Sequence, residues 1–81
     1  MTKNNNFDQR ILTIINLFNK NEYDEVIKSA IDLSEKNNTI SIIPNLIGAS
    51  YARKNHHEQA IYYFEKAIKI EPSNFELYNN I

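Results

Sequence analysis

The sequence contains no cysteine and no tryptophan, and only one glycine and two prolines among its 81 residues. Without cysteine, no disulfide framework can form. The nine basic and ten acidic residues leave a net charge of −1, so the strongly basic face of a nucleic-acid-binding protein is not expected. The longest apolar stretch, residues 11–18, is interrupted by Thr13 and Asn16 and is too short to span a bilayer. We therefore expect no nucleic-acid partner, no membrane partner and, by default, a cytoplasmic location.

The residue groups that carry catalysis are also missing from the sequence. There is no nucleophile accompanied by its base, no glycine-rich phosphate loop and no cysteine cluster. The adjacent His56 and His57 are the one pair that suggests a metal site. Neighbouring residues on a helix point about 100° apart, so these two are poor joint ligands. The sequence thus predicts no enzyme, no catalytic residue, no cofactor and no metal.

Apolar residues recur with the period of an α-helix in four separate stretches of the chain. The stretches are Ile11, Ile14, Ile15 and Phe18; Val26, Ile27, Ala30, Ile31 and Leu33; Leu46, Ile47, Ala49 and Tyr51; and Ala60, Ile61, Phe64, Ala67 and Ile68. They predict helices near residues 7–20, 23–37, 41–54 and 57–70, with a fifth beginning near 74. The breaks between them are short and polar, which makes consecutive helices antiparallel. We therefore expect an all-α fold.

Asparagine residues in two of these breaks are interpreted as helix N-caps. Asn21 precedes Asp24 by three residues, and Asn55 precedes Glu58 by three, as in a capping arrangement. Pro72 keeps the preceding residue out of the α region and so predicts the end of the fourth helix.

A shift of 34 residues aligns the first pair of helices with the second. The aligned identities are Leu12 with Leu46, Lys20-Asn21 with Lys54-Asn55, and Ile27 with Ile61. Because both polar turns and both apolar phases agree, the sequence indicates a repeated helical hairpin, and a third copy would begin at Phe75.

Gly48 lies in the middle of the third predicted helix, where glycine costs roughly 0.5–1 kcal/mol relative to alanine. Ala60, another small residue, follows twelve positions later in the next antiparallel helix. The larger Tyr51 and Phe64 flank the pair. The pattern predicts a close approach of the two helices at Gly48.

Residues 41–74 resemble the tetratricopeptide repeat (TPR). The positions that carry the resemblance are Ile47, Gly48, Tyr51, Ala60, Phe64, Ala67 and Pro72. Pro44 departs from the family pattern, which usually has tryptophan or another large residue there. The resemblance implies antiparallel hairpins stacked as a short right-handed α-solenoid. The expected order is a disordered segment at 1–6, a divergent repeat at 7–40, the clear repeat at 41–74, and the first turns of a third-repeat or capping helix at 75–81.

The resemblance also implies a concave peptide-binding groove, lined by the first helix of each hairpin. The groove residues it predicts are Ile11, Leu12, Ile15, Phe18, Asn45, Leu46, Ala49, Arg53, Asn79 and Asn80. Apolar residues at 11, 15 and 49 stand where chaperone-binding members have Lys and Asn, so the carboxylate-gripping version is not expected. The groove holds an apolar or helical segment of a partner, or it packs against the chain's own N-terminus or a second copy.

Two function classes follow for a chain of this kind. The first is a protein–protein interaction scaffold whose partner is a protein or peptide. The second is the N-terminal TPR segment of a larger enzyme, such as a glycosyl- or sulfotransferase. Apolar residues of the terminal segment also allow self-association as a homo-oligomer; these are Phe75, Leu77, Tyr78 and Ile81.

Overall fold

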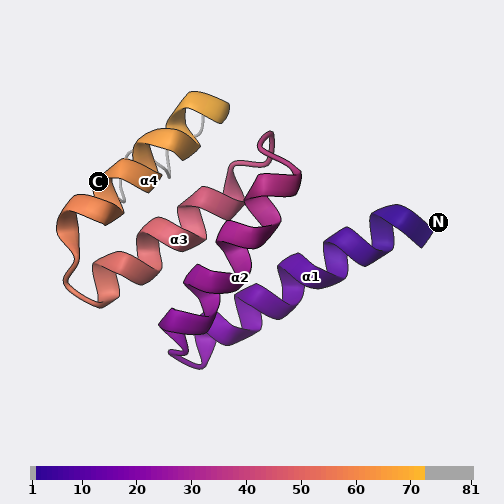
Figure 1. Ribbon diagram of the computed structural model, residues 1–81, viewed down its shortest axis with the longest axis horizontal. Coiled ribbons are helices and arrows are strands. Elements are labelled where there is room, and N and C mark those ends of the chain that lie inside the picture. The colour runs from indigo at the N-terminus through magenta and orange to yellow at the C-terminus, as the bar shows by residue number, and fades with distance from the viewer. Residues whose placement is uncertain (1, 73–81) are drawn as a thin grey trace.

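The computed structural model describes the backbone of residues 2–72 and the side chains of residues 8–72. This part of the chain forms four helices and no strand. The helices are α1 (Thr2–Asn19), α2 (Tyr23–Lys36), α3 (Ile42–Arg53) and α4 (His57–Ile70). Figure 1 shows α1 and α2 as one antiparallel hairpin and α3 and α4 as a second, with α3 lying against the first hairpin. The predicted all-α fold of stacked hairpins is confirmed.

The predicted helix bounds agree with the structure except at the beginning of α1. The sequence predicts that residues 1–6 are disordered. In the structure α1 begins at Thr2, so residues 2–6 are helical. A packed helix extends readily, since each added residue gains a backbone hydrogen bond without a new nucleation step. The other bounds differ by at most one residue. The helix expected near residue 74 lies outside the described residues.

The third helix accommodates its proline in the first turn, as the sequence requires. Ser41 is the N-cap of α3, so Pro44 is the third helical residue, where a backbone N–H has no partner within the helix. The Ser41 hydroxyl donates a hydrogen bond to the carboxylate of Glu71, which follows α4 directly. This contact joins the beginning of α3 to the end of α4.

The two asparagines interpreted as N-caps terminate the preceding helices instead. Asn21 has φ 65°, in the left-handed region. Its N–H donates to the carbonyl of Phe18 at 2.9 Å, and the N–H of Glu22 donates to the carbonyl of Leu17 at 2.9 Å. These two bonds define a Schellman motif, in which a residue with positive φ satisfies the last free carbonyls of a helix. The N-cap prediction for Asn21 was therefore wrong.

The turn at Asn55 repeats this geometry 34 residues later. Asn55 also has φ 65°, and its N–H reaches the carbonyl of Ala52 at 3.0 Å. The N–H of His56 donates to the carbonyl of Tyr51 at 2.9 Å. His56 is the N-cap of α4, and its side chain makes no capping hydrogen bond. The shared Lys-Asn pair marks the left-handed end of the first helix in each hairpin.

Replacing Asn55 with glycine should stabilise the protein. An L-residue in the left-handed region costs about 1–2 kcal/mol, less for asparagine, and glycine avoids this cost. We expect Asn55→Gly to raise the free energy of unfolding by about 0.5 kcal/mol in urea titrations. Asn16→Gly, the same substitution inside α1, should lower it by a few tenths. Equal effects at the two sites would contradict the assigned turn.

The hydrophobic core lies where the two hairpins meet. Six side chains from α1, α2 and α3 form it, each no more than 4% exposed. They are Ile14, Val26, Ala30, Leu33, Ile43 and Ile47. On the other side of α3, the buried Ala60, Phe64 and Ala67 attach α4. Helix α3 therefore belongs to both packing layers, because it packs against α2 on one side and α4 on the other.

The close approach predicted at Gly48 is confirmed, and the structure shows what fills the space. A Cβ atom added at Gly48 would lie 2.7 Å from Cδ1 and Cε1 of the Phe64 ring. It would also lie 3.1 Å from the carbonyl oxygen of Ala60. The Phe64 ring therefore rests directly on the backbone of α3, and even a methyl group at position 48 would displace it.

Gly48→Ala should destabilise the protein although alanine is the better helix former. We expect a net loss of about 1–2 kcal/mol, because overpacking costs about 1–3 kcal/mol and helix propensity returns only about 1 kcal/mol. Thermal and urea unfolding measure the effect. If the Phe64 ring is the obstacle, the loss should shrink in a Phe64→Leu background. A stabilised Gly48→Ala variant would refute this contact.

Ser50 is fully buried in α3, and its hydroxyl has no hydrogen-bond partner among the described residues. A buried hydroxyl without a partner costs about 1–3 kcal/mol. We expect Ser50→Ala to raise the free energy of unfolding by about 1 kcal/mol. Ser34→Ala is the matched control, because the Ser34 hydroxyl donates to the Ile31 carbonyl at 2.8 Å. A destabilising Ser50→Ala would contradict the prediction, because it would show that the Ser50 hydroxyl has a hydrogen-bond partner.

Candidate functional site

The groove residues predicted on α1 and α3 are unequally available to a partner. Ile11, Phe18 and Leu46 are half-buried and pack against the core, and Ile15, Asn45 and Ala49 are also half-buried. Leu12 is different, because 56% of it is exposed. The predicted Asn79 and Asn80 lie outside the described residues. Leu12 is thus the apolar groove residue with the most surface left for a partner.

Arg53, predicted at the edge of the groove, binds the first hairpin of its own chain. Its guanidinium carbon lies 5.2 Å from the centre of the Phe18 ring and 6.0 Å from that of Tyr23. It also donates a hydrogen bond of 3.0 Å to the Tyr23 hydroxyl. The next residue, Lys54, forms an ion pair with Asp24. Arg53 therefore holds the end of α3 against α1 and α2, although its side chain remains exposed.

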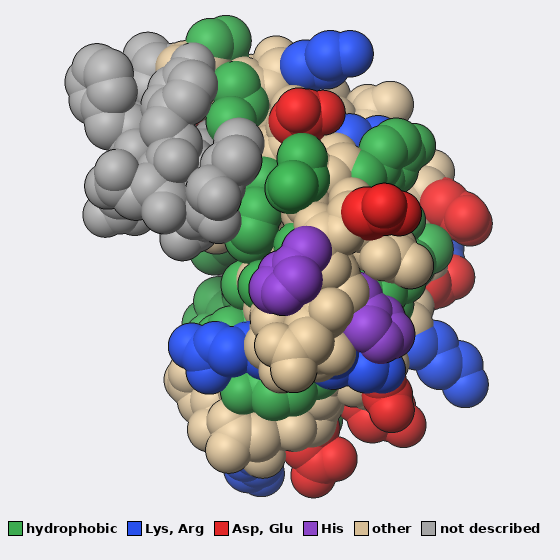
Figure 2. Space-filling model, turned by 90° about the vertical axis from the view of Figure 1, so that its left-hand side faces the viewer, with side chains coloured by type: hydrophobic (Ala, Val, Ile, Leu, Met, Phe, Trp, Pro, Cys, Tyr) green, Lys and Arg blue, Asp and Glu red, His purple; other side chains and the backbone are tan. Residues whose placement is uncertain are grey.

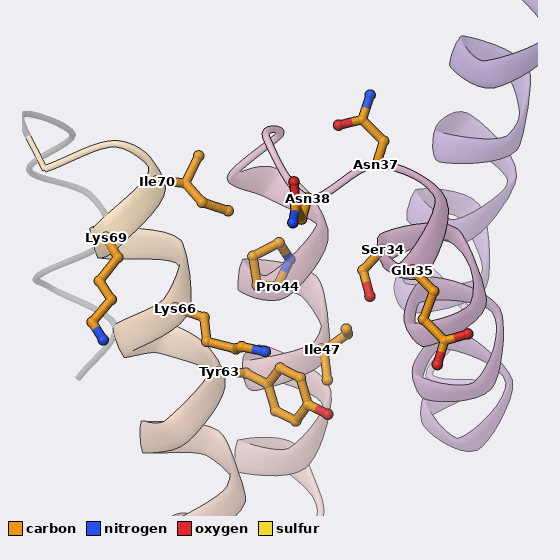
Figure 3. A pocket seen from close by; sticks show the side chains of 10 residues that line it. All are labelled: Ser34, Glu35, Asn37, Asn38, Pro44, Ile47, Tyr63, Lys66, Lys69 and Ile70. Carbon is orange, nitrogen blue, oxygen red and sulfur yellow. The ribbon is translucent and has the colours of Figure 1, made fainter.

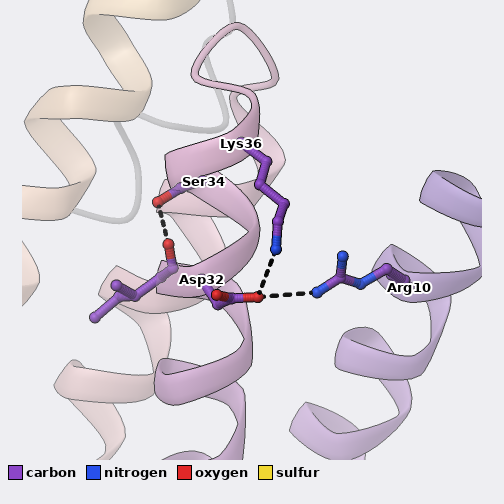
Figure 4. Close-up of polar contacts among 5 residues, drawn as sticks. Arg10, Asp32, Ser34 and Lys36 are labelled. Atoms are coloured by element: carbon purple, nitrogen blue, oxygen red, sulfur yellow. Dashed lines mark hydrogen bonds and ion pairs between the residues drawn. The ribbon is translucent and has the colours of Figure 1, made fainter.

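A second polar contact ties α1 to α2 on the surface. Asp32 accepts hydrogen bonds from Arg10 at 3.1 Å and from Lys36 at 3.3 Å (Figure 4). The hydrogen bond from Arg10, followed by that from Lys36, lowers the pKa of the Asp32 carboxyl. Arg10 on α1 and Lys36 on α2 share the Asp32 carboxylate, so these contacts join the two helices at the surface.

Exposed apolar side chains occur in two places among the described residues. Leu12 on α1 and Ile42 on α3 belong to the helices that the sequence assigns to the groove, and Ile42 is 38% exposed. Ile61 and Tyr62 lie on α4, with 42% and 56% exposed. The α4 pair has a similar exposure and lies outside the predicted groove, so it provides a comparison for the α1–α3 pair.

A cavity that the sequence reasoning missed lies between α2, α3 and α4 (Figure 3). Its volume is about 440 Å³. It is lined by Ser34, Glu35, Asn37, Asn38, Pro44, Ile47, Tyr63, Lys66, Lys69 and Ile70. None of these was among the predicted groove residues, and none comes from α1. Pro44, a compact side chain where the family pattern has a large one, was the signal that could have indicated this space.

The Tyr63 ring lines the cavity, where it contacts two other tyrosine rings and the side chain of Lys66. Tyr63 stacks on Tyr51 with 5.9 Å between ring centres, and meets Tyr62 edge-on at 5.0 Å. The ammonium of Lys66 lies 5.2 Å from the centre of the Tyr62 ring and 5.9 Å from that of Tyr63. Burial raises the pKa of the Tyr63 phenol above its usual value of 10.0, and Tyr51 and Tyr62 add to the rise. Tyr63 is therefore a hydrogen-bond donor at neutral pH.

No group of His, Cys, Asp and Glu side chains suited to a metal ion occurs in the part of the chain that the structure describes. The two histidines appear as separate surface patches in Figure 2, because adjacent residues at the beginning of a helix point in different directions. Acidic and basic side chains are interspersed on this face. Within residues 2–72, no helix has the length and apolar character needed to cross a membrane.

Comparison with known protein families yields a match in the second hairpin. The family model of the tetratricopeptide repeat matches residues 45–74, which comprise most of α3 and all of α4. The matched segment begins directly after Pro44, the residue at which the sequence departs from the family pattern. No curated protein and no solved structure matches the chain.

Proposed function

We propose that the chain is a protein–protein interaction scaffold that holds an apolar segment of a partner against α1 and α3, because residues 45–74 match the family model of the tetratricopeptide repeat. Repeats of this family generally mediate interactions between proteins. Helices α1 and α3 are the first helices of the two hairpins, and they contact each other across the hairpin junction. The proposed binding face consists of Leu12 and Ile42 with the half-buried Ile15 and Ala49 beside them.

The exposure of Leu12 is the observation that supports this proposal best. Leu12 is 56% exposed, and covering it with a partner would favour binding by roughly 25 cal/mol per Å² of apolar surface removed from water. The charged residue expected at the edge of this face, Arg53, already stacks on Phe18. The partner is therefore recognised by its apolar side chains, as when the apolar face of a helix enters a groove.

Peptides selected from a random library on the immobilised 81-residue chain should lose affinity for Leu12→Asp. We expect the dissociation constant to rise at least about tenfold, because an aspartate cannot replace an apolar contact worth about 1.5 kcal/mol or more. Fluorescence anisotropy with the selected peptides measures it. Leu12 is exposed, so the variant should keep the helical content and the unfolding midpoint of the parent chain.

Ile61→Asp is the control for this experiment, because Ile61 is a similarly exposed apolar residue on α4. It should change the affinity less than about twofold. Peptides that bind Leu12→Asp as tightly as the unchanged chain, or that lose binding to Ile61→Asp instead, would show that the α1–α3 face is not the interaction surface.

A further inference from the structure

We propose that the cavity between α2, α3 and α4 is a second binding site, which takes an acidic side chain and an apolar side chain two residues later in an extended segment of a partner protein. The two sites share no residue, because Leu12 and Ile42 do not line the cavity. At about 440 Å³, the cavity lies within the range of ligand pockets, roughly 300–1,000 Å³.

Of the three charged residues that line the cavity, only Lys66 points into it, and its ammonium has no carboxylate partner among the described residues. Figure 3 shows the Lys66 side chain pointing into the space, whereas Lys69 and Glu35 point away from it. The ion pairs of the described residues join Asp32 to Arg10 and Lys36, and Asp24 to Lys54, so none of them neutralises Lys66. The rings of Tyr62 and Tyr63 orient its ammonium without cancelling its charge.

Donors outnumber acceptors where a ligand would lie beside Lys66. The cavity adds the phenol of Tyr63, which is protonated at neutral pH like any ordinary tyrosine, and the amide of Asn38. An ammonium, a hydroxyl and an amide together suit an oxygen anion. One lysine balances the single charge of a carboxylate, whereas a phosphate carries up to two charges and favours clusters of arginine.

The floor of the cavity determines what should be attached to that carboxylate. Pro44, Ile47 and Ile70 provide an apolar surface beside the lysine. An aliphatic side chain on the same face of the segment as the acidic one would cover this surface, while the carboxylate of the acidic residue meets Lys66. The matching sequence is Glu or Asp with Leu, Ile or Val two residues later, because alternate side chains of an extended segment lie on the same face.

Chemical-shift titration of the ¹⁵N-labelled 81-residue chain tests the site directly. The probe is a blocked pentapeptide of sequence Ser-Glu-Ser-Leu-Ser, in which Glu and Leu lie on the same face of the extended backbone. We expect saturable shifts at Asn38, Lys66 and Ile70. Replacing Glu with Gln in the peptide, or Lys66 with Gln in the chain, should raise the dissociation constant about tenfold, since each removes a charge-assisted hydrogen bond.

Matched variants make the outcome unambiguous. Lys69→Gln removes the same charge from a lysine that points away, and it should change the dissociation constant less than about twofold. Leu12→Asp should leave it unchanged, so the two proposed sites fail separately. The proposal is overturned if no saturable shift appears, if Lys66→Gln and Lys69→Gln behave alike, or if the shifts cluster around Leu12. Sodium hexanoate that binds as tightly as the peptide would make the site one for small carboxylates and would also overturn it.

Discussion

The packing of this molecule depends on the missing side chain at Gly48. A Cβ atom at position 48 would lie only 2.7 Å from the Phe64 ring and 3.1 Å from the Ala60 carbonyl oxygen, so both groups occupy the space that a side chain would need. These contacts fix both the separation of α3 from α4 and the rotation of α4 about its own axis. With Phe64 turned onto α3, the preceding Tyr63 points about 100° away, toward α2. The wall of the cavity therefore follows from the contact at Gly48.

Helix α3 transmits this arrangement to the first hairpin. Ile43 and Ile47 on one side enter the core with α1 and α2, while Gly48 meets α4. At its C-terminal end, Arg53 covers Phe18 and Lys54 pairs with Asp24. Stability in stacked repeats is nearly the sum of each unit and its interface with the next. Here a single helix contributes to the core of each unit and to the interface between them.

The sequence was sufficient to predict the helices and the contact at Gly48, because periodic apolar residues and a costly mid-helix glycine each have few explanations. It was insufficient at Asn21 and Asn55, since asparagine suits both an N-cap and a left-handed helix end. Both asparagines stand two residues before the next helix, which is one place too early for an N-cap. The engagement of Arg53 and the inward direction of Lys66 depend on side-chain conformations in the folded chain, which spacing along the sequence does not encode.

The two proposed sites should differ in how they affect the rest of the protein. Leu12 stands outside the core, so a partner on the α1–α3 face adds contact area at the surface without contacting a core side chain. The cavity shares Ile47 with the core, and its walls come from both hairpins. A ligand there would contact α2 and α4 at once. Because it would bind only when the two helices are packed together, it would stabilise their packed arrangement. Pro44 makes this coupling possible, because a larger residue at that place would fill the space with the chain's own atoms.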